Sequence, residues 1–198
     1  MAITIQERLD PSSYRHVPWK NGGGVTIDIA AEYEPGADPD GWQGVIWRLS
    51  RTRIERPGPF SDLSGYDRLL AVIDGAGLIL HPKDRAPIDV GKPLHAVRFA
   101  GEWPIDSELT QGPVGVLNLL ADRRKAGIDL LFIASKSRAN LPAADAILLA
   151  LLSAQLRLDG QPTSLAADGA IRASGPGLLQ VEEGLVAVAL ITRTALAG

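Results

Sequence analysis

The stretch GVIWRLSRTRIE, residues 44–55, sets the fold class of this chain. Read as a strand, it places alternate apolar residues from Val45 to Leu49 on one face, because successive side chains point to opposite faces. The other face carries Arg48, Ser50 and Thr52. That face either meets solvent or lines a cavity, in which the planar fork of Arg48 would grip a carboxylate. The pattern alone leaves both interpretations open.

Similar short segments recur along the chain, separated by 21 glycines and 14 prolines. VGVLNLL (114–120) and GLVAVALITR (184–193) are typical of strands. Asp-Gly pairs beginning at Asp74, Asp159 and Asp168 are signals for hairpin-type turns. Short strands at regular spacing favour a β-sandwich or barrel, so we expect a mostly β fold.

The apolar segment PAADAILLALLSAQL (142–156) is the one candidate for a helix of ordinary length. Its composition suits a helix, but an apolar run of this length fits a buried strand equally well. It lies in a Leu- and Ala-rich C-terminal part, whereas the aromatic residues and unusual polar motifs lie almost entirely before residue 120.

Composition excludes several classes of function. The chain has 198 residues, a net charge of −3 and no cysteine. Disulfides, thiolate nucleophiles and cysteine-ligated metals are therefore excluded, and neither nucleic acid nor an anionic membrane is expected as a partner. The N-terminus lacks a signal-peptide pattern and the longest apolar run is too short to cross a bilayer, so a cytoplasmic protein is expected.

The three histidines predict a metal-free site. His16, His81 and His95 fall in no paired ligand motif, and a three-histidine site would have to use all of them from separate loops. No G-x-S-x-G motif supports a hydrolytic triad. We therefore predict no metal, no cofactor and no catalytic residue.

Two further motifs carry charge or unusual backbone. In YDRLLAVID (66–74), Asp67 and Arg68 point to opposite faces of the expected strand, and either could be a buried anchor. WKNGGG (19–24) is neither a Walker loop nor a Rossmann fingerprint. Its glycines could present N–H groups to an anion or let two strands pass closely.

Together these motifs resemble the HutD/Ves family of cupin-like proteins. The resemblance runs, in order, through VPWKNGGGVTIDIA (17–30), the segment 47–80, VRFAGEWP (97–104) and GPVGVLNLL (112–120). It implies a mostly β, bicupin-like fold of the RmlC-like type, with two β-barrel or jelly-roll halves in one compact chain. The approximate halves are 1–120, an N-terminal cupin-like barrel with the pocket, and 121–198, a C-terminal β half.

The resemblance also implies a function in histidine utilization. The expected protein is a small-molecule-binding regulator that senses a small acidic intermediate, of the urocanate or formiminoglutamate type. Its partner would be a carboxylate-bearing molecule, and a homodimer is an open alternative. The ligand-binding residues carried over from the family are Trp19, Lys20, Asn21, Gly22, Gly23, Thr26, Arg48, Ser50, Phe60, Ser61, Tyr66 and Asn118.

The chain departs from the family at two positions. Val25 stands where a second threonine is common, and Asp28 stands where a glutamate is common. Both residues are compatible with a strand. Whether Asp28 reaches the group that the longer glutamate reaches is left open.

Two other functions stay open at this stage. The first is an enzyme of small-molecule metabolism on a metal-free cupin scaffold, for which Asp67 or Asp28 would have to act as acid or base. The second is a structural or protein-interaction module with a vestigial pocket. Deep burial of Arg48 in a closed salt bridge would favour the module.

Overall fold

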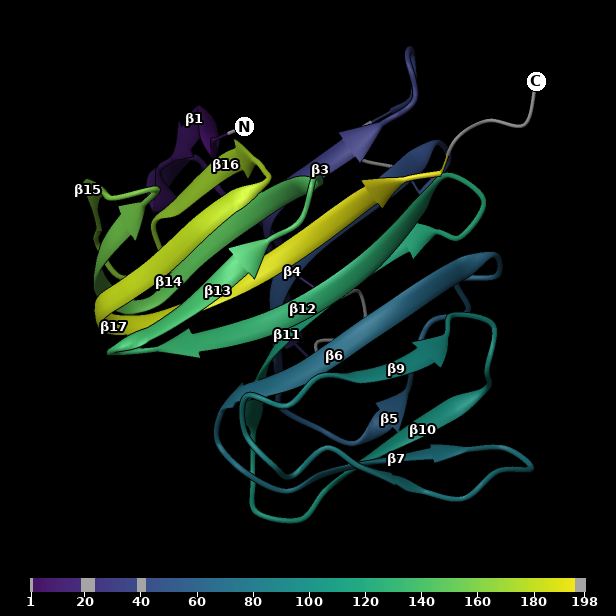
Figure 1. The fold of residues 1–198 in the computed structure, drawn as a ribbon. Coiled ribbons are helices and arrows are strands. Elements are labelled where there is room, and N and C mark those ends of the chain that lie inside the picture. Colours follow the sequence, from purple (N-terminus) through teal and green to yellow (C-terminus); the bar gives the residue numbers. More distant parts are fainter. Residues whose placement is uncertain (1, 19–23, 39–41, 195–198) are drawn as a thin grey trace. The chain divides into compact units, whose positions relative to one another are not determined.

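The computed structural model describes residues 2–18, 24–38 and 42–194, and the chain is mostly β, as predicted (Figure 1). It divides into two units. Among the described residues, the terminal unit comprises 2–14 and Gly127–Thr194, and the central unit comprises those of Arg15–Ala126. Within the described ranges the only helix is the short 3-10 turn η1, Pro11–Ser13. No described helix has the length and apolarity needed to span a membrane.

The terminal unit is one sheet of order β1-β16-β14-β17-β12, with β13 paired to β17 and β15 paired to β14. The N-terminal residues belong to it because β1 pairs antiparallel with β16. Its strands are β1 Thr4–Leu9, β12 Ala126–Ala134, β13 Ser137–Leu141, β14 Asp145–Leu158, β15 Gln161–Leu165, β16 Ala170–Ser174 and β17 Gly177–Arg193.

The apolar segment 142–156 forms a strand, which resolves the ambiguity of its pattern. β14 pairs with β17 along most of its length, and on its other side with β16 and then β15. Its residues Ala146–Ala150 are all buried, so both faces are apolar and no alternation reveals the strand. Pairing with distant strands overrides the helical preference of its alanines and leucines.

The three Asp-Gly pairs are all at turns, but only one closes a hairpin. Asp159 and Gly160 both have positive φ and join β14 to β15, which pair directly. Asp74-Gly75 instead connects β6 to β7, which lie in different sheets. Asp168-Gly169 joins β15 to β16, which both pair with β14 but not with each other. The hairpin prediction is therefore wrong at two of these turns, because partner choice depends on distant strands.

The central unit has two sheets, of orders β2-β3-β4-β11-β6-β9 and β5-β10-β7-β8. Leu70 and Val72 of β6 and Val116 of β11 share a core with Leu78 and Leu80 of β7, so the larger sheet turns this inner face toward the smaller one. Its strands are β2 Arg15–Pro18, β3 Gly24–Tyr33, β4 Val45–Ile54, β5 Gly58–Pro59, β6 Tyr66–Asp74, β7 Leu78–Pro82, β8 Ile88–Asp89, β9 Val97–Ala100, β10 Ile105–Leu109 and β11 Val114–Asp122.

Substitutions at two glycines, Gly184 and Gly160, test the irregular pairing of β14 with β17. Gly184 has φ +95° beside the register shift, and an added Cβ would lie 2.3 Å from the Ser153 carbonyl oxygen. Gly160 has a similar φ of +83° with open space around it. We expect Gly160→Ala to cost about 1–2 kcal/mol through backbone strain alone. Gly184→Ala should cost about 1–3 kcal/mol more, since backbone must shift.

Urea unfolding of the two variants beside the wild type measures this difference. Equal midpoints for Gly184→Ala and Gly160→Ala would show that the contact with Ser153 is relieved without cost.

Candidate functional site

The candidate site is the polar part of the inner face of the six-stranded sheet. The strand register places Asp28 opposite Ser50, Ser50 opposite Asn118, and Asn118 opposite Leu70. Residues directly opposite one another point to the same face. These side chains therefore form one row that crosses β3, β4, β11 and β6.

The adjoining row carries two arginines. Leu120 of β11 lies opposite both Arg48 of β4 and Arg68 of β6, and Phe99 of β9 lies opposite Arg68. Neighbouring strands are about 4.8 Å apart, so the two arginine α-carbons are about 10 Å apart. Arg48 is 6% exposed and Arg68 8% exposed. The polar face of β4 is therefore buried, not turned to solvent.

Asp28 holds Arg48 in place. Its Oδ1 accepts a hydrogen bond from Arg48 Nε at 2.6 Å and also contacts Arg48 Nη2. Its Oδ2 accepts from Arg15 Nη2 at 2.9 Å and from Arg15 Nε at 3.2 Å. The shorter aspartate thus reaches two guanidinium groups. The buried pair with Arg48 is the feature that favours the structural-module alternative.

Arg68 is held differently. Its Nη2 lies 3.4 Å from the Asn118 side-chain oxygen, and its buried Nε has no hydrogen-bond partner among the residues that the structure describes. The rings of Phe60 and Phe99 lie 4.9 Å and 5.1 Å from its guanidinium carbon. Burial lowers the pKa of Arg68 to about 10, so the side chain is still charged at neutral pH.

Asp67 lies on the other face of β6, as the alternation predicts. Its carboxylate contacts Arg123 Nε at 3.1 Å and Arg98 Nη1 at 3.7 Å. Arg123 also forms two hydrogen bonds to Glu102, both at 2.7 Å. This network is partly exposed and separate from the arginines of the inner face.

The other predicted site residues divide into three groups. Thr26 joins the inner face through a hydrogen bond of 3.2 Å between its hydroxyl and that of Thr52. Ser61 is exposed between β5 and β6, and the Tyr66 hydroxyl donates to the Val45 carbonyl at 2.8 Å. Neither residue makes a described contact with Arg48 or Arg68. The predicted residues Trp19, Lys20, Asn21, Gly22 and Gly23 lie outside the described residues.

Four residues of this region were absent from the predicted site. Arg68 and Phe99 form its second guanidinium position, and Arg15 and Trp42 flank the first. The signal for Arg68 was present, because an arginine in phase with Leu70 and Val72 belongs to a buried face. Arg15 and Phe99 are identified only by strand pairing, and Trp42 only by its contact with Arg48 in the structure.

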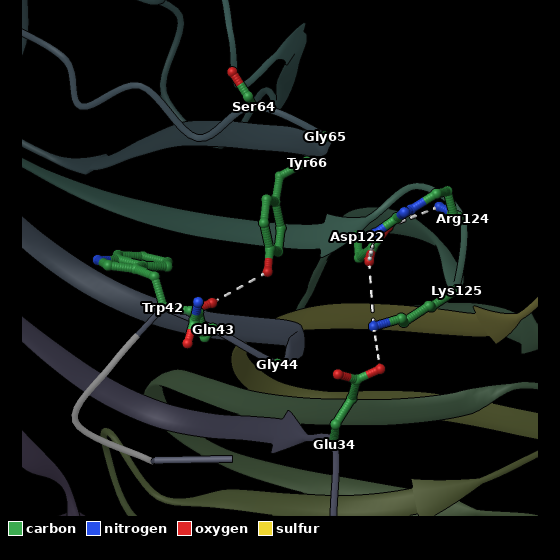
Figure 2. A pocket seen from close by; sticks show the side chains of 10 residues that line it. All are labelled: Glu34, Trp42, Gln43, Gly44, Ser64, Gly65, Tyr66, Asp122, Arg124 and Lys125. Atoms are coloured by element: carbon green, nitrogen blue, oxygen red, sulfur yellow. Dashed lines mark hydrogen bonds and ion pairs between the residues drawn. The ribbon is translucent and has the colours of Figure 1, made fainter.

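A cavity of about 190 Å³ lies at the end of these strands (Figure 2). Figure 2 shows Lys125 between Glu34 and Asp122. Its Nζ lies 2.5 Å from a carboxylate oxygen of Glu34 and 3.4 Å from one of Asp122. Trp42 also lines the cavity, is 45% exposed, and its ring lies 4.8 Å from the Arg48 guanidinium carbon. The indole is therefore shared between the cavity wall and the buried arginine.

The charges of the cavity are compensated among themselves. Burial alone would raise the pKa of Asp122, but hydrogen bonds from Arg124 hold it below its usual value. The hydrogen bond to Glu34 raises the pKa of Lys125. Burial, with the charge of Asp122, raises the pKa of Tyr66. Arg124 and Lys125 thus face the carboxylates of Glu34 and Asp122. The described lining therefore has no excess positive charge that would bind an added anion.

The part of the chain that the structure describes contains no group of three histidine, aspartate or glutamate side chains able to hold a metal ion. The inner face itself offers mainly guanidinium, hydroxyl and carboxamide groups. Such donors suit an anion with several acceptor oxygens.

Comparison with known proteins identifies relatives over most of the chain. The sequence model of a family described as HutD matches residues 11–188. An uncharacterised 21.2 kDa protein from the hutC 3′ region of Pseudomonas putida is 33% identical over 145 residues, which cover 73% of each chain. The structure of HutD from Pseudomonas fluorescens, in a formate condition, matches with a TM-score of 0.78 and 25% identity, over 98% of this chain and 100% of that one.

A more distant likeness defines the fold. A cupin 2 conserved barrel domain protein from Leptotrichia buccalis matches with a TM-score of 0.51 at 8% identity, over 96% of this chain and 98% of that one. The fold is therefore cupin-like. The finer prediction of two cupin halves stays a prediction.

Replacing Asp28 tests whether the inner face depends on this one carboxylate. Asp28→Asn leaves Arg48 buried without its counter-charge, which typically costs about 3–5 kcal/mol. Asp67→Asn, on the outer face, removes a partly exposed partner of Arg123 and should cost under about 1 kcal/mol. Free energies of unfolding measured in urea compare the two. Similar losses would mean that Asp28 has no special role in the packing of Arg48.

Proposed function

The chain belongs to the HutD family, which is linked to the histidine utilization locus, and we propose that it binds a small carboxylic acid of that pathway. The acid lies on the inner face of the central unit, between β4 and β6. The protein acts in the cytoplasm as a sensor of an acidic intermediate of the urocanate or formiminoglutamate type.

One observation carries this proposal: the described inner face buries more positive than negative charge. Arg48 and Arg68 are both buried, and Arg15 joins Arg48 at the edge. Asp28 is the carboxylate that Arg15 and Arg48 contact, whereas Arg68 has only the neutral Asn118 as a described hydrogen-bond partner. A buried charge without a partner costs several kcal/mol. An added carboxylate would offset that cost, whereas a neutral ligand would not.

The alternatives account for less of this arrangement. A purely structural module explains the pair of Asp28 with Arg48, but it gives no reason to bury Arg68 beside the neutral Asn118. An enzyme would need a free acid or base. Both oxygens of Asp28 accept hydrogen bonds from guanidinium groups, and Asp67 faces away.

A thermal-shift screen against urocanate, formiminoglutamate, glutamate and histidine tests the proposal. A ligand that binds only the folded state raises the melting temperature by mass action. We expect a concentration-dependent rise with urocanate or formiminoglutamate, which carry a net negative charge, and a smaller one or none with histidine, whose ammonium group balances its carboxylate. No rise with any acid of the pathway would overturn the proposal.

Replacing Arg48 tests whether the acid reaches β4. Arg48→Lys loses the planar fork, and a charge-assisted pair contributes about 1.5–3 kcal/mol, so urocanate binding should weaken about tenfold or more. Arg51→Lys, on the opposite face of the same strand, should change it far less. Calorimetric titration compares the two. Equal effects, or none, would show that Arg48 does not face the ligand.

A further inference from the structure

We propose that one carboxylate of the acid docks on Arg68, at the edge formed by its Nε and Nη2 atoms, while Arg48 contacts the far end of the ligand. The identity of the acid rests on the proposed function, but the anion site itself does not. The site would take one carboxylate group of a small acid.

The hydrogen-bonding edge of Arg68 is the first reason. The Nε–H and one Nη2–H of an arginine lie side by side and match the two oxygens of a carboxylate. Within the described part of the chain, this edge of Arg68 meets one long contact, 3.4 Å from Nη2 to the Asn118 oxygen, and Nε meets no acceptor. Buried donors are almost always satisfied, so an unpaired one signals a missing acceptor.

The aromatic neighbours of the guanidinium are the second reason. Phe60 and Phe99 both lie within about 5 Å of its central carbon. Aromatic rings attract a cation and exclude water beside it, but they offer no carboxylate-like acceptor to its N–H groups. They also bear no negative charge, so an incoming anion has no competitor to displace.

The contrast between the two arginines is the third reason. Arg48 Nε donates to Asp28 at 2.6 Å, so its charge is already compensated. Arg68 has only the neutral Asn118 as a hydrogen-bond partner among the described residues. An anion therefore gains more at Arg68, and one carboxylate suffices to compensate the charge there.

Asn118 gives a direct test, because an aspartate at this position would itself supply the missing carboxylate. We would titrate the full-length protein with sodium formate, against sodium chloride at matched ionic strength, and separately with trans-urocanate. Asn118→Asp should weaken formate binding at least tenfold while the melting temperature stays at or above that of the wild type. Asn140→Asp, exposed on β13, is the matched control and should bind like the wild type.

The arginine variants separate the two ends of the ligand. Arg68→Lys keeps the charge but loses the Nε–Nη2 edge, and should weaken both formate and urocanate at least tenfold. Arg48→Lys should weaken urocanate but leave formate nearly unchanged. In ¹H–¹⁵N spectra, the Nε–H resonance that is absent from Arg68→Lys should shift when formate is added to the wild type.

The outcomes distinguish this inference from the proposed function. Formate binding that depends on Arg68 and Asn118, without binding of any pathway acid, would support the anion site and overturn the pathway assignment. Urocanate binding, together with formate binding that Asn118→Asp does not weaken, would support the proposed function and overturn the anion site at Arg68. Failure of the wild type to bind formate, or loss of formate binding in Arg48→Lys alone, would overturn the site at Arg68.

Discussion

On the described inner face of the central unit, the positive charge of the arginines exceeds the negative charge of the one carboxylate that contacts them, Asp28. Asp28 is shared between Arg15 and Arg48, and each of its oxygens serves one guanidinium group. A second buried arginine, Arg68, lies two strands away beside a carboxamide. Desolvating a guanidinium costs several kcal/mol, and hydrogen bonds to neutral groups recover only part of that cost. The sheet tolerates the excess because its strands are paired on both sides and packed over an apolar core.

That core explains where the charge can be placed. Along β6 and β11, the inner face passes from Val72 and Val116 to Leu70 and Asn118, and then to Arg68 and Leu120. One end is therefore a fixed apolar base shared with β7, and the other a polar surface built on the same strands. Polar groups carried by paired strands are positioned more precisely than groups on loops. The arginines can therefore keep one geometry whether or not an anion is present.

Sequence reasoning identified the strands and the direction of the key side chains, because alternation is a local property. Arg48, Ser50 and Thr52 are buried on one face, and Asp67 and Arg68 point apart, as the period of two requires. It could not decide whether 142–156 is a helix, since that depends on β17 more than twenty residues away. For the same reason it missed Arg15 and Phe99, whose places follow from the pairing of β2 with β3 and of β9 with β6.

The packing around Arg68 also defines the shape of anion it can accept. The phenyl rings occupy part of the space around the guanidinium carbon, and Nε has no acceptor among the described residues, so we expect a ligand along the Nε–Nη2 edge. A planar carboxylate can place both oxygens on that edge at once, and such paired, charge-assisted bonds are stronger than single neutral ones. A halide can occupy only one point of it, and a tetrahedral oxyanion carries further oxygens that would be left against aromatic carbon. Unpaired polar atoms in such surroundings are costly, so the geometry favours small planar acids over both.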